Sequence, residues 1–358
     1  MFARLKRKIR RKIQSVLGCS ECLASLNSLE RNIESRLIDI GQRLRAADDF
    51  EAFIQSLSSI RLEVTNKCNY HCPMCPHDAM TRPKGFLSLE DLDWMLKNIS
   101  AFRPEYDGDV NLQGSGEPLL DKDLPAKVAL IKRHLPKSQV WIITTLGVRR
   151  QQKWFESLIE AGLDKIAVSC YGYDRGSYHC AHGLDNFELV MLNCDILSEV
   201  NKEYGIEISY KGMFSNYPGV EIAEKFKFLL EPLDCDAYDS FKQKMVNRGF
   251  IFTNSCLDNY GAGNITNLER PLRPCSVHNG KLSRVLQIDW DGRVIPCCRI
   301  TNQEIILGDL RTQSLREICG GGAWLDFKRA HQRLDLREAY PYCWRCLQDA
   351  SHWDKFTP

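Results

Sequence analysis

The chain has 358 residues, of which 44% are apolar and 26% charged, as is typical of a soluble globular protein with a large core. Its formal net charge of +2 gives no overall attraction to nucleic acid, and no apolar run is long enough to span a membrane. Sixteen cysteines without a recognisable export signal argue against a secreted disulfide scaffold. They indicate metal or redox chemistry in a reducing compartment, so we expect a cytoplasmic protein.

An N-terminal helical extension is expected over residues 1–57. Residues 4–12 carry seven Lys or Arg, and apolar residues recur there every three or four positions, which predicts an amphipathic basic helix. Such a helix could lie on an anionic membrane surface, but we favour packing on the rest of the chain or on a second subunit. A further pattern between Leu26 and Leu44 has the period of a short coiled-coil seam or of a single packed helix. Membrane-surface contact and a homodimer therefore both stay open.

Three cysteines, Cys68, Cys72 and Cys75, follow an apolar strand-like run at residues 60–64 with the spacing C-x3-C-x2-C. Three thiolates this close in sequence can bind one face of a four-iron cluster and leave the fourth iron without a protein ligand. An open metal position is where a small molecule can bind. A zinc site would instead prefer two C-x2-C pairs, and only one such pair is present in this loop.

Strand-like runs alternate with helical patterns through the central domain, residues 58–248. Such alternation predicts parallel strands joined by helical crossovers, hence an α/β barrel or an open sheet. In these folds the active site lies at the C-terminal ends of the strands. Ser88 and Asp91 form a capping-box pattern at the start of one helix. The strand-like runs are 110–113, 140–143, 165–168 and 206–209, and two helical patterns are 154–161 and 187–200.

Short polar motifs follow these strands. Residues 114–118, Gly-Ser-Gly-Glu-Pro, combine a glycine turn that permits close backbone approach with a carboxylate able to accept bonds from an ammonium group. Thr144 and Thr145 end the next strand, and Ser169 ends the one after. Together with the cysteine loop, these motifs resemble those of the radical S-adenosylmethionine (SAM) superfamily. Ser115, Leu146 and the pair at 170–171 depart from the usual residues of that family.

The resemblance implies a partial (β/α)6 radical SAM barrel whose open iron holds the amino and carboxylate groups of SAM. It also implies which residues contact the cofactor, with Glu117 expected at the amino group. Lys211 is a candidate for the substrate or for the SAM carboxylate. The implied SAM-binding residues are Tyr70, Ser115, Gly116, Glu117, Pro118, Thr144, Thr145, Ser169 and Lys211.

Cysteine returns in the C-terminal domain, residues 249–358. Two apolar runs flank an Asp-Gly pair at 291–292, which predicts a β-hairpin that ends at Cys297, and Ser314 with Glu317 forms a second capping-box pattern. The whole run resembles the C-terminal extension called SPASM, or its shorter relative called twitch. That resemblance implies one auxiliary 4Fe–4S cluster with four cysteine ligands. These are Cys275, Cys297, Cys343 and Cys346.

Two alternatives in this domain stay open. Adjacent residues of a strand point to opposite faces, so we prefer Cys297 over Cys298 as the second ligand without excluding Cys298. Four cysteines also suit zinc, although the upstream motifs favour cluster chemistry. No role is evident for Cys256.

The expected function is that of a radical SAM oxidoreductase that removes a hydrogen atom from a small polar substrate, such as a sugar or an aminocyclitol. A filled auxiliary cluster would take up the second electron, and a flavodoxin- or ferredoxin-type protein would supply reducing electrons. Two alternatives are a peptide-modifying maturase and a radical epimerase. An epimerase needs a thiol that returns a hydrogen atom, and the first candidates are Cys170 and Cys180, with Cys235, Cys256 and Cys298 also free.

Overall fold

The computed structural model describes residues 28–29, 32–33, 35–36, 50–214, 235–256, 275 and 284–347. The chain divides into two compact units, Met1–Phe50 and Glu51–Pro358. The described residues between 28 and 36 are helical, but the basic helix and most of the coiled-coil pattern lie outside the described residues. So do the side chains of Cys235 and Cys256. No helix in the described part of the chain is long and apolar enough to cross a bilayer.

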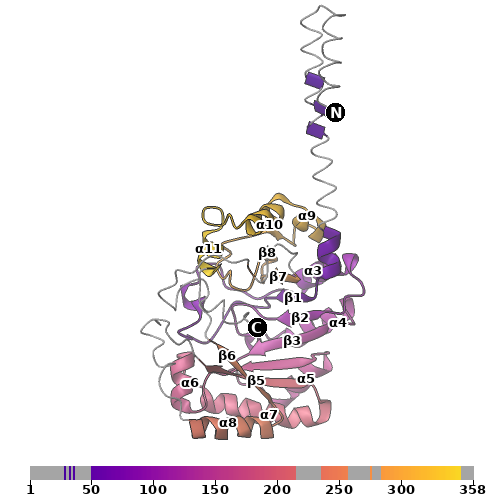
Figure 1. The fold of residues 1–358 in the computed structure, drawn as a ribbon. Coiled ribbons are helices and arrows are strands. Elements are labelled where there is room, and N and C mark those ends of the chain that lie inside the picture. The colour runs from indigo at the N-terminus through magenta and orange to yellow at the C-terminus, as the bar shows by residue number, and fades with distance from the viewer. Residues whose placement is uncertain are drawn as a thin grey trace, which may run out of the picture. The chain divides into compact units, whose positions relative to one another are not determined.

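The second unit is built on one mixed sheet of nine strands in the order β6-β5-β4-β3-β2-β1-β7-β8-β9 (Figure 1). The first six strands are all parallel, and among the described strands β6 and β9 are the two edges, so the sheet remains open. The prediction of an α/β fold with a partial barrel is confirmed. The six parallel strands are β1 (Ser59–Leu62), β2 (Asp109–Leu112), β3 (Gln139–Thr144), β4 (Lys165–Ser169), β5 (Glu207–Phe214) and β6 (Ile251–Cys256).

The predicted hairpin is present and extends this same sheet. β7 (Val285–Ile288) lies parallel to β1, with Ser59 opposite Val285 and Leu62 opposite Ile288. β8 (Arg293–Ile295) returns antiparallel to β7, and β9 (Gly308–Asp309) pairs antiparallel with β8. Gly292 has φ +84°, which the turn between β7 and β8 requires and which glycine adopts without strain. The C-terminal segment is therefore joined to the parallel sheet by backbone hydrogen bonds.

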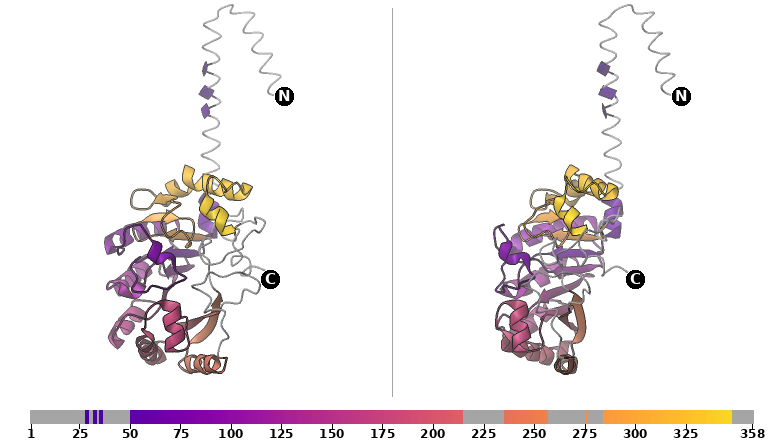
Figure 2. Two further views of the ribbon diagram at one scale, coloured as in Figure 1. Left: turned by 90° about the vertical axis from the view of Figure 1, so that its left-hand side faces the viewer. Right: turned by 60° about the vertical axis from the view of Figure 1, so that its left-hand side comes forward.

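Helices connect the strands as the alternating pattern predicted. The Ser88 Oγ accepts a hydrogen bond from the Asp91 N–H at 3.0 Å, and Ser314 forms a complete capping box with Glu317, so both predicted helix starts are confirmed. The C-terminal helices lie at the end of the sheet that holds β7 and β8 (Figure 2). The helices are η1 (Pro76–Ala79), α3 (Leu89–Phe102), η2 (Pro118–Leu120), α4 (Leu124–His134), α5 (Gln152–Glu160), α6 (Arg175–His182), α7 (Phe187–Tyr204), α8 (Cys235–Asn247), α9 (Leu315–Cys319), α10 (Gly322–Arg333) and α11 (Pro341–Leu347).

The central strands bury one face of the sheet completely. Val110, Leu112, Val140 and Ile142 are all completely inaccessible to solvent, and because they alternate along β2 and β3 in register they lie on the same face. On the other face of β3, Trp141 and Ile143 are half-buried. This rigid core fixes the loops that follow the strands and that form the site.

Candidate active site

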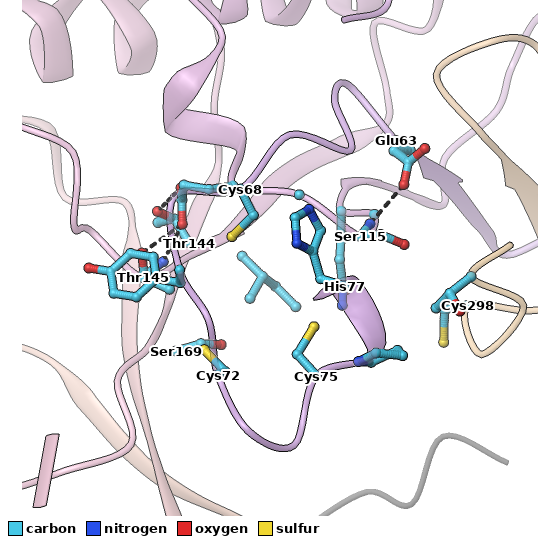
Figure 3. Close-up of a pocket in the computed structure, with 18 of the residues that line it drawn as sticks. Glu63, Cys68, Cys72, Cys75, His77, Ser115, Thr144, Thr145, Ser169 and Cys298 are labelled. Carbon is cyan, nitrogen blue, oxygen red and sulfur yellow. Dashed lines mark hydrogen bonds between the residues drawn. The ribbon is translucent and has the colours of Figure 1, made fainter. Parts of the chain in front are cut away.

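A pocket opens at the C-terminal ends of β1 to β4. Cys68, Cys72 and Cys75 line it from the loop that follows β1, and their sulfur atoms face the same space (Figure 3). Turns after β2, β3 and β4 complete this side of the pocket. The predicted position of the site at the C-terminal ends of parallel strands is thus found in the structure.

The cysteine loop and the glycine turn are packed backbone to backbone. The Cys75 N–H donates to the Cys72 carbonyl at 2.9 Å, which closes a tight turn between two of the thiols. A Cβ atom placed on Gly116 would lie 2.5 Å from the carbonyl oxygens of both Thr65 and Lys67, so only glycine fits there. This close approach explains why Gly116 follows β2 at that position.

The three thiols suit a four-iron cluster better than a single ion. Burial raises the pKa of the Cys68 thiol to about 12 and raises those of Cys72 and Cys75, so the thiolates need a cation to offset the loss of water. Within the described ranges, no three His, Cys, Asp or Glu side chains converge closely enough to hold one metal ion. Thiolates that each bind a different iron of a cluster do not need to meet at one point. The residues present therefore fit the cluster.

The hydrogen-bond acceptor positions of the Glu117 carboxylate are all used by donors within the protein. Its buried carboxylate accepts hydrogen bonds from Thr144 Oγ1 at 2.5 Å, from Thr145 N and Oγ1 at 2.8 Å each, and from Leu119 N at 3.0 Å. Two carboxylate oxygens have about four acceptor positions, so these bonds use the full capacity of the group. Glu117 thus braces the end of β3 against η2, and its contact with the SAM amino group remains a prediction.

The other predicted SAM-binding residues separate into two groups. Tyr70, Ser115, Gly116, Thr144, Thr145 and Ser169 line the pocket together with Glu117. Pro118 starts η2 behind it, and Lys211 lies on β5 outside the lining, where burial lowers the pKa of its ammonium group.

The first two candidates for a hydrogen-donating thiol also lie outside the lining. Cys170 is completely buried, and burial raises the pKa of its thiol to about 12. Cys180 is exposed on α6. Cys298, by contrast, lines the pocket opposite the cysteine loop (Figure 3).

A buried ion network that is not apparent from the sequence lies beside the pocket, and two of its members, Glu63 and Asp289, line it. Arg82 makes two hydrogen bonds to Glu63, at 2.9 and 2.8 Å, and lies 3.4 Å from the Asp289 carboxylate. All three side chains are buried. Glu63 also accepts from the Ser115 N–H at 2.7 Å, and Arg82 Nε donates to the Thr301 carbonyl at 2.6 Å. The network thereby joins β1, the glycine turn and the segment that follows β8.

The C-terminal hairpin supplies the opposite side of the pocket. Gln287 is buried there, and its Oε1 has no partner among the described residues. Asp289 also lines the pocket, and burial, reinforced by the nearby Glu63 carboxylate, raises its pKa to about 8. The Cys298 thiol accepts a hydrogen bond from Arg61 Nη1 at 3.0 Å. Gln287, Asp289 and Cys298 thus line the cavity from this side.

The four predicted auxiliary ligands lie close together. Burial raises the pKa of the Cys297 thiol, and the neighbouring thiols of Cys298, Cys346 and Cys275 raise it further. Burial also raises the pKa of the Cys343 thiol, and the nearby thiols of Cys346 and Cys275 raise it further. Cys298 lines the pocket described above, whereas Cys297 does not, so the two adjacent thiols lie in different environments. This arrangement supports Cys297 as the ligand.

Replacing Cys297 with serine is expected to remove the auxiliary cluster, because a closed cubane needs all four thiolates. Iron should fall from about eight to about four atoms per chain in anaerobically reconstituted protein. Cys298→Ser is the matched control and should retain about eight. The reverse result for the two variants would assign the ligand to Cys298.

Two family profiles match the chain. That of the radical SAM superfamily covers residues 62–214, and that of SPASM, an iron–sulfur cluster-binding domain, covers residues 275–347. Among curated proteins, GTP 3',8-cyclases of Cronobacter sakazakii and Klebsiella pneumoniae are 32% and 31% identical over 152 and 149 residues. Each match covers 40% of this chain and 44% of the relative, so the chain spans less than half the length of these relatives.

Solved structures with the same fold are more distant in sequence. BtrN in complex with AdoMet and 2-DOIA is 18% identical, with a TM-score of 0.51 over 82% of this chain and 92% of that one. The AdoMet complex of anSMEcpe is 16% identical, with a TM-score of 0.55 over 81% and 88%. Streptococcus suis SuiB, bound to its precursor peptide SuiA, is 10% identical, with a TM-score of 0.57 over 76% and 67%. At these identities the likeness concerns the fold alone.

Proposed function

Because the chain belongs to the radical SAM superfamily and carries a SPASM domain, with SAM and 4Fe–4S clusters as its cofactors, we propose that it oxidises a small polar substrate by two electrons. The single observation that carries this proposal is that Asp289, a buried carboxyl residue with a raised pKa, is among the residues that line the pocket. When bound, the first cluster and SAM together supply a one-electron cleavage that leads to removal of a hydrogen atom from a carbon of the substrate.

The chain's own residues would bind the cluster and SAM and hold them in place. Cys68, Cys72 and Cys75 would hold three of the four irons, and the glycine turn beside them would approach SAM closely. Thr144 and Thr145 are fixed by Glu117, so their positions are set before any ligand binds. Preorganised contacts of this kind hold reactants in a productive geometry at little entropic cost.

The hairpin side of the pocket suits a substrate with hydroxyl or amino groups. A buried amide oxygen without a partner is costly, and a substrate donor would satisfy Gln287 Oε1. Asp289, whose pKa is raised to about 8, can accept the proton of a substrate hydroxyl in its ionised form, which becomes the main form as the pH rises through about 8. Cys275, Cys297, Cys343 and Cys346 would hold the auxiliary cluster, which would supply an acceptor for the second electron. A flavodoxin- or ferredoxin-type protein would be the source of reducing electrons.

Oxidation requires the ionised form of Asp289, so the rate is expected to rise with pH up to about 8. Asp289→Asn has nearly the same shape but cannot accept the proton, and we expect it to reduce product formation by about 10²-fold or more. SAM cleavage should continue in the variant. The measurement is the product mass, which should be two units lower than that of the substrate, followed across pH. A variant that forms this product at the wild-type rate would exclude Asp289 as the base.

A second candidate, radical epimerisation, is favoured by the position of Cys298. Among the cysteines whose side chains are described, it is the non-ligand thiol that lines the pocket. It could donate a hydrogen atom to a substrate carbon radical, after which one electron and one proton from the protein reductant would restore the thiol. A product one mass unit heavier in deuterated water, lost in Cys298→Ala, would favour epimerisation over oxidation. Reaction only with a peptide would favour the maturase instead.

A further inference from the structure

His182 connects helix α6 to the cysteine loop. It is the last residue of α6, and its side chain is completely buried. Its Nδ1 lies 3.4 Å from the Sγ of Cys72, one of the three proposed cluster ligands. Its carbonyl oxygen accepts a hydrogen bond from the His71 N–H at 3.3 Å, so the backbone of the loop is attached at the same point.

The tautomer of His182 follows from its second nitrogen. The backbone N–H of Tyr171 donates to Nε2 at 2.9 Å. A backbone N–H can only donate, so Nε2 must carry a lone pair. The neutral ring then has its proton on Nδ1, which faces Cys72. A metal-bound thiolate can only accept, so the pair is an N–H···S hydrogen bond directed from histidine to cysteine.

Aromatic side chains hold the imidazole in this orientation. Tyr178 stacks on it with ring centroids 4.4 Å apart, and Tyr171 stacks at 5.3 Å with planes 4° apart. Tyr70 meets it edge-on at 5.4 Å. A ring that is confined by three neighbours cannot swing away from Cys72 without disturbing all of them. The N–H···S contact is therefore part of a fixed construction.

We propose that His182 is a positioning residue that raises the reduction potential of the cluster held by Cys68, Cys72 and Cys75. Reduction adds one negative charge to the cluster, and a hydrogen-bond donor on a ligand sulfur stabilises that charge. Donation from Nδ1 therefore favours the reduced state that SAM cleavage requires. This inference rests on the proposed binding of a cluster by these cysteines.

The test compares midpoint potentials in anaerobic redox titrations, using the EPR signal that changes when SAM is added. His182→Phe keeps a stacking ring but loses the donor, and the equilibrium constant for its reduction should fall about tenfold, which is about 59 mV for one electron. His182→Asn places an amide N–H near the position of Nδ1 and should recover most of this loss. Tyr178→Phe is the control, since it removes only the 2.7 Å hydroxyl contact with Tyr70 and should leave the potential unchanged.

A second measurement covers the case in which the phenylalanine variant does not assemble a cluster. In the otherwise unaltered protein with ¹⁵N-labelled histidine, pulsed EPR should detect a weak nitrogen coupling to the reduced cluster that disappears in His182→Asn. An unchanged potential in a loaded His182→Phe protein, or the absence of any such coupling, would overturn the inference. Failure of the unaltered protein to assemble a SAM-responsive cluster would instead refute the proposed function itself.

Discussion

Replacing Cys72 with alanine is expected to eliminate the SAM-binding cluster and all SAM cleavage. The three thiolates of the loop are the protein's whole contribution to that cluster, so loss of one leaves two irons without protein ligands. Iron should fall from about eight to about four atoms per chain, because the auxiliary cluster has its own four cysteines. Iron and sulfide analysis with EPR of the reduced protein measures this directly.

Cys170→Ala provides the matched control for Cys72→Ala. Cys170 is buried but does not line the pocket, so its loss should leave the iron content and SAM cleavage intact. If Cys72→Ala retained a full complement of iron and cleaved SAM at the normal rate, the assignment of the cysteine loop would be wrong.

Replacing Arg82 with methionine is expected to reduce the free energy of unfolding by about 3–5 kcal/mol. Methionine fills a similar volume, but it leaves the buried Glu63 carboxylate without its cation and removes the positive charge that lies 3.4 Å from Asp289. It also removes the bond to the Thr301 carbonyl, which connects the C-terminal segment to the rest of the sheet. Chemical denaturation of the reconstituted variant and of the unaltered protein measures this difference in the free energy of unfolding.

Arg329→Met tests whether loss of any arginine has this effect. Arg329 is exposed and pairs with Asp326 on the same helix, an arrangement that contributes little. Its replacement should change the free energy of unfolding by less than about 0.5 kcal/mol. Equal effects of the two replacements would contradict the role given to the buried network.

The sequence predicts the elements that carry a local pattern. The strands β1 to β5 are visible in the sequence as apolar runs. The Ser88 cap, the Ser314 capping box and the Asp-Gly turn all occur where expected. The sequence gives no clear signal for β6, because its residues, Ile-Phe-Thr-Asn-Ser-Cys, form neither an apolar run nor an alternating pattern. The pairing of β7 with β1 was also not predicted, since the two strands are more than 220 residues apart and no local signal encodes their contact.

The same distinction applies to the site. The cysteine spacings and the glycine turn point to the pocket because their residues are adjacent in sequence. The Glu63–Arg82–Asp289 network and His182 come from separate segments that only the fold brings together. One signal was present in the sequence: Glu63 is a charged residue inside the apolar run at 60–64, and a buried charge there requires a partner.

The most direct test of the whole account is reductive cleavage of SAM by the anaerobically reconstituted, unaltered protein. With a strong one-electron reductant, the protein should convert SAM to methionine and 5′-deoxyadenosine in equal amounts. If the protein carries its full iron content and yet produces no 5′-deoxyadenosine, the cysteine loop does not hold a cluster that is open to SAM.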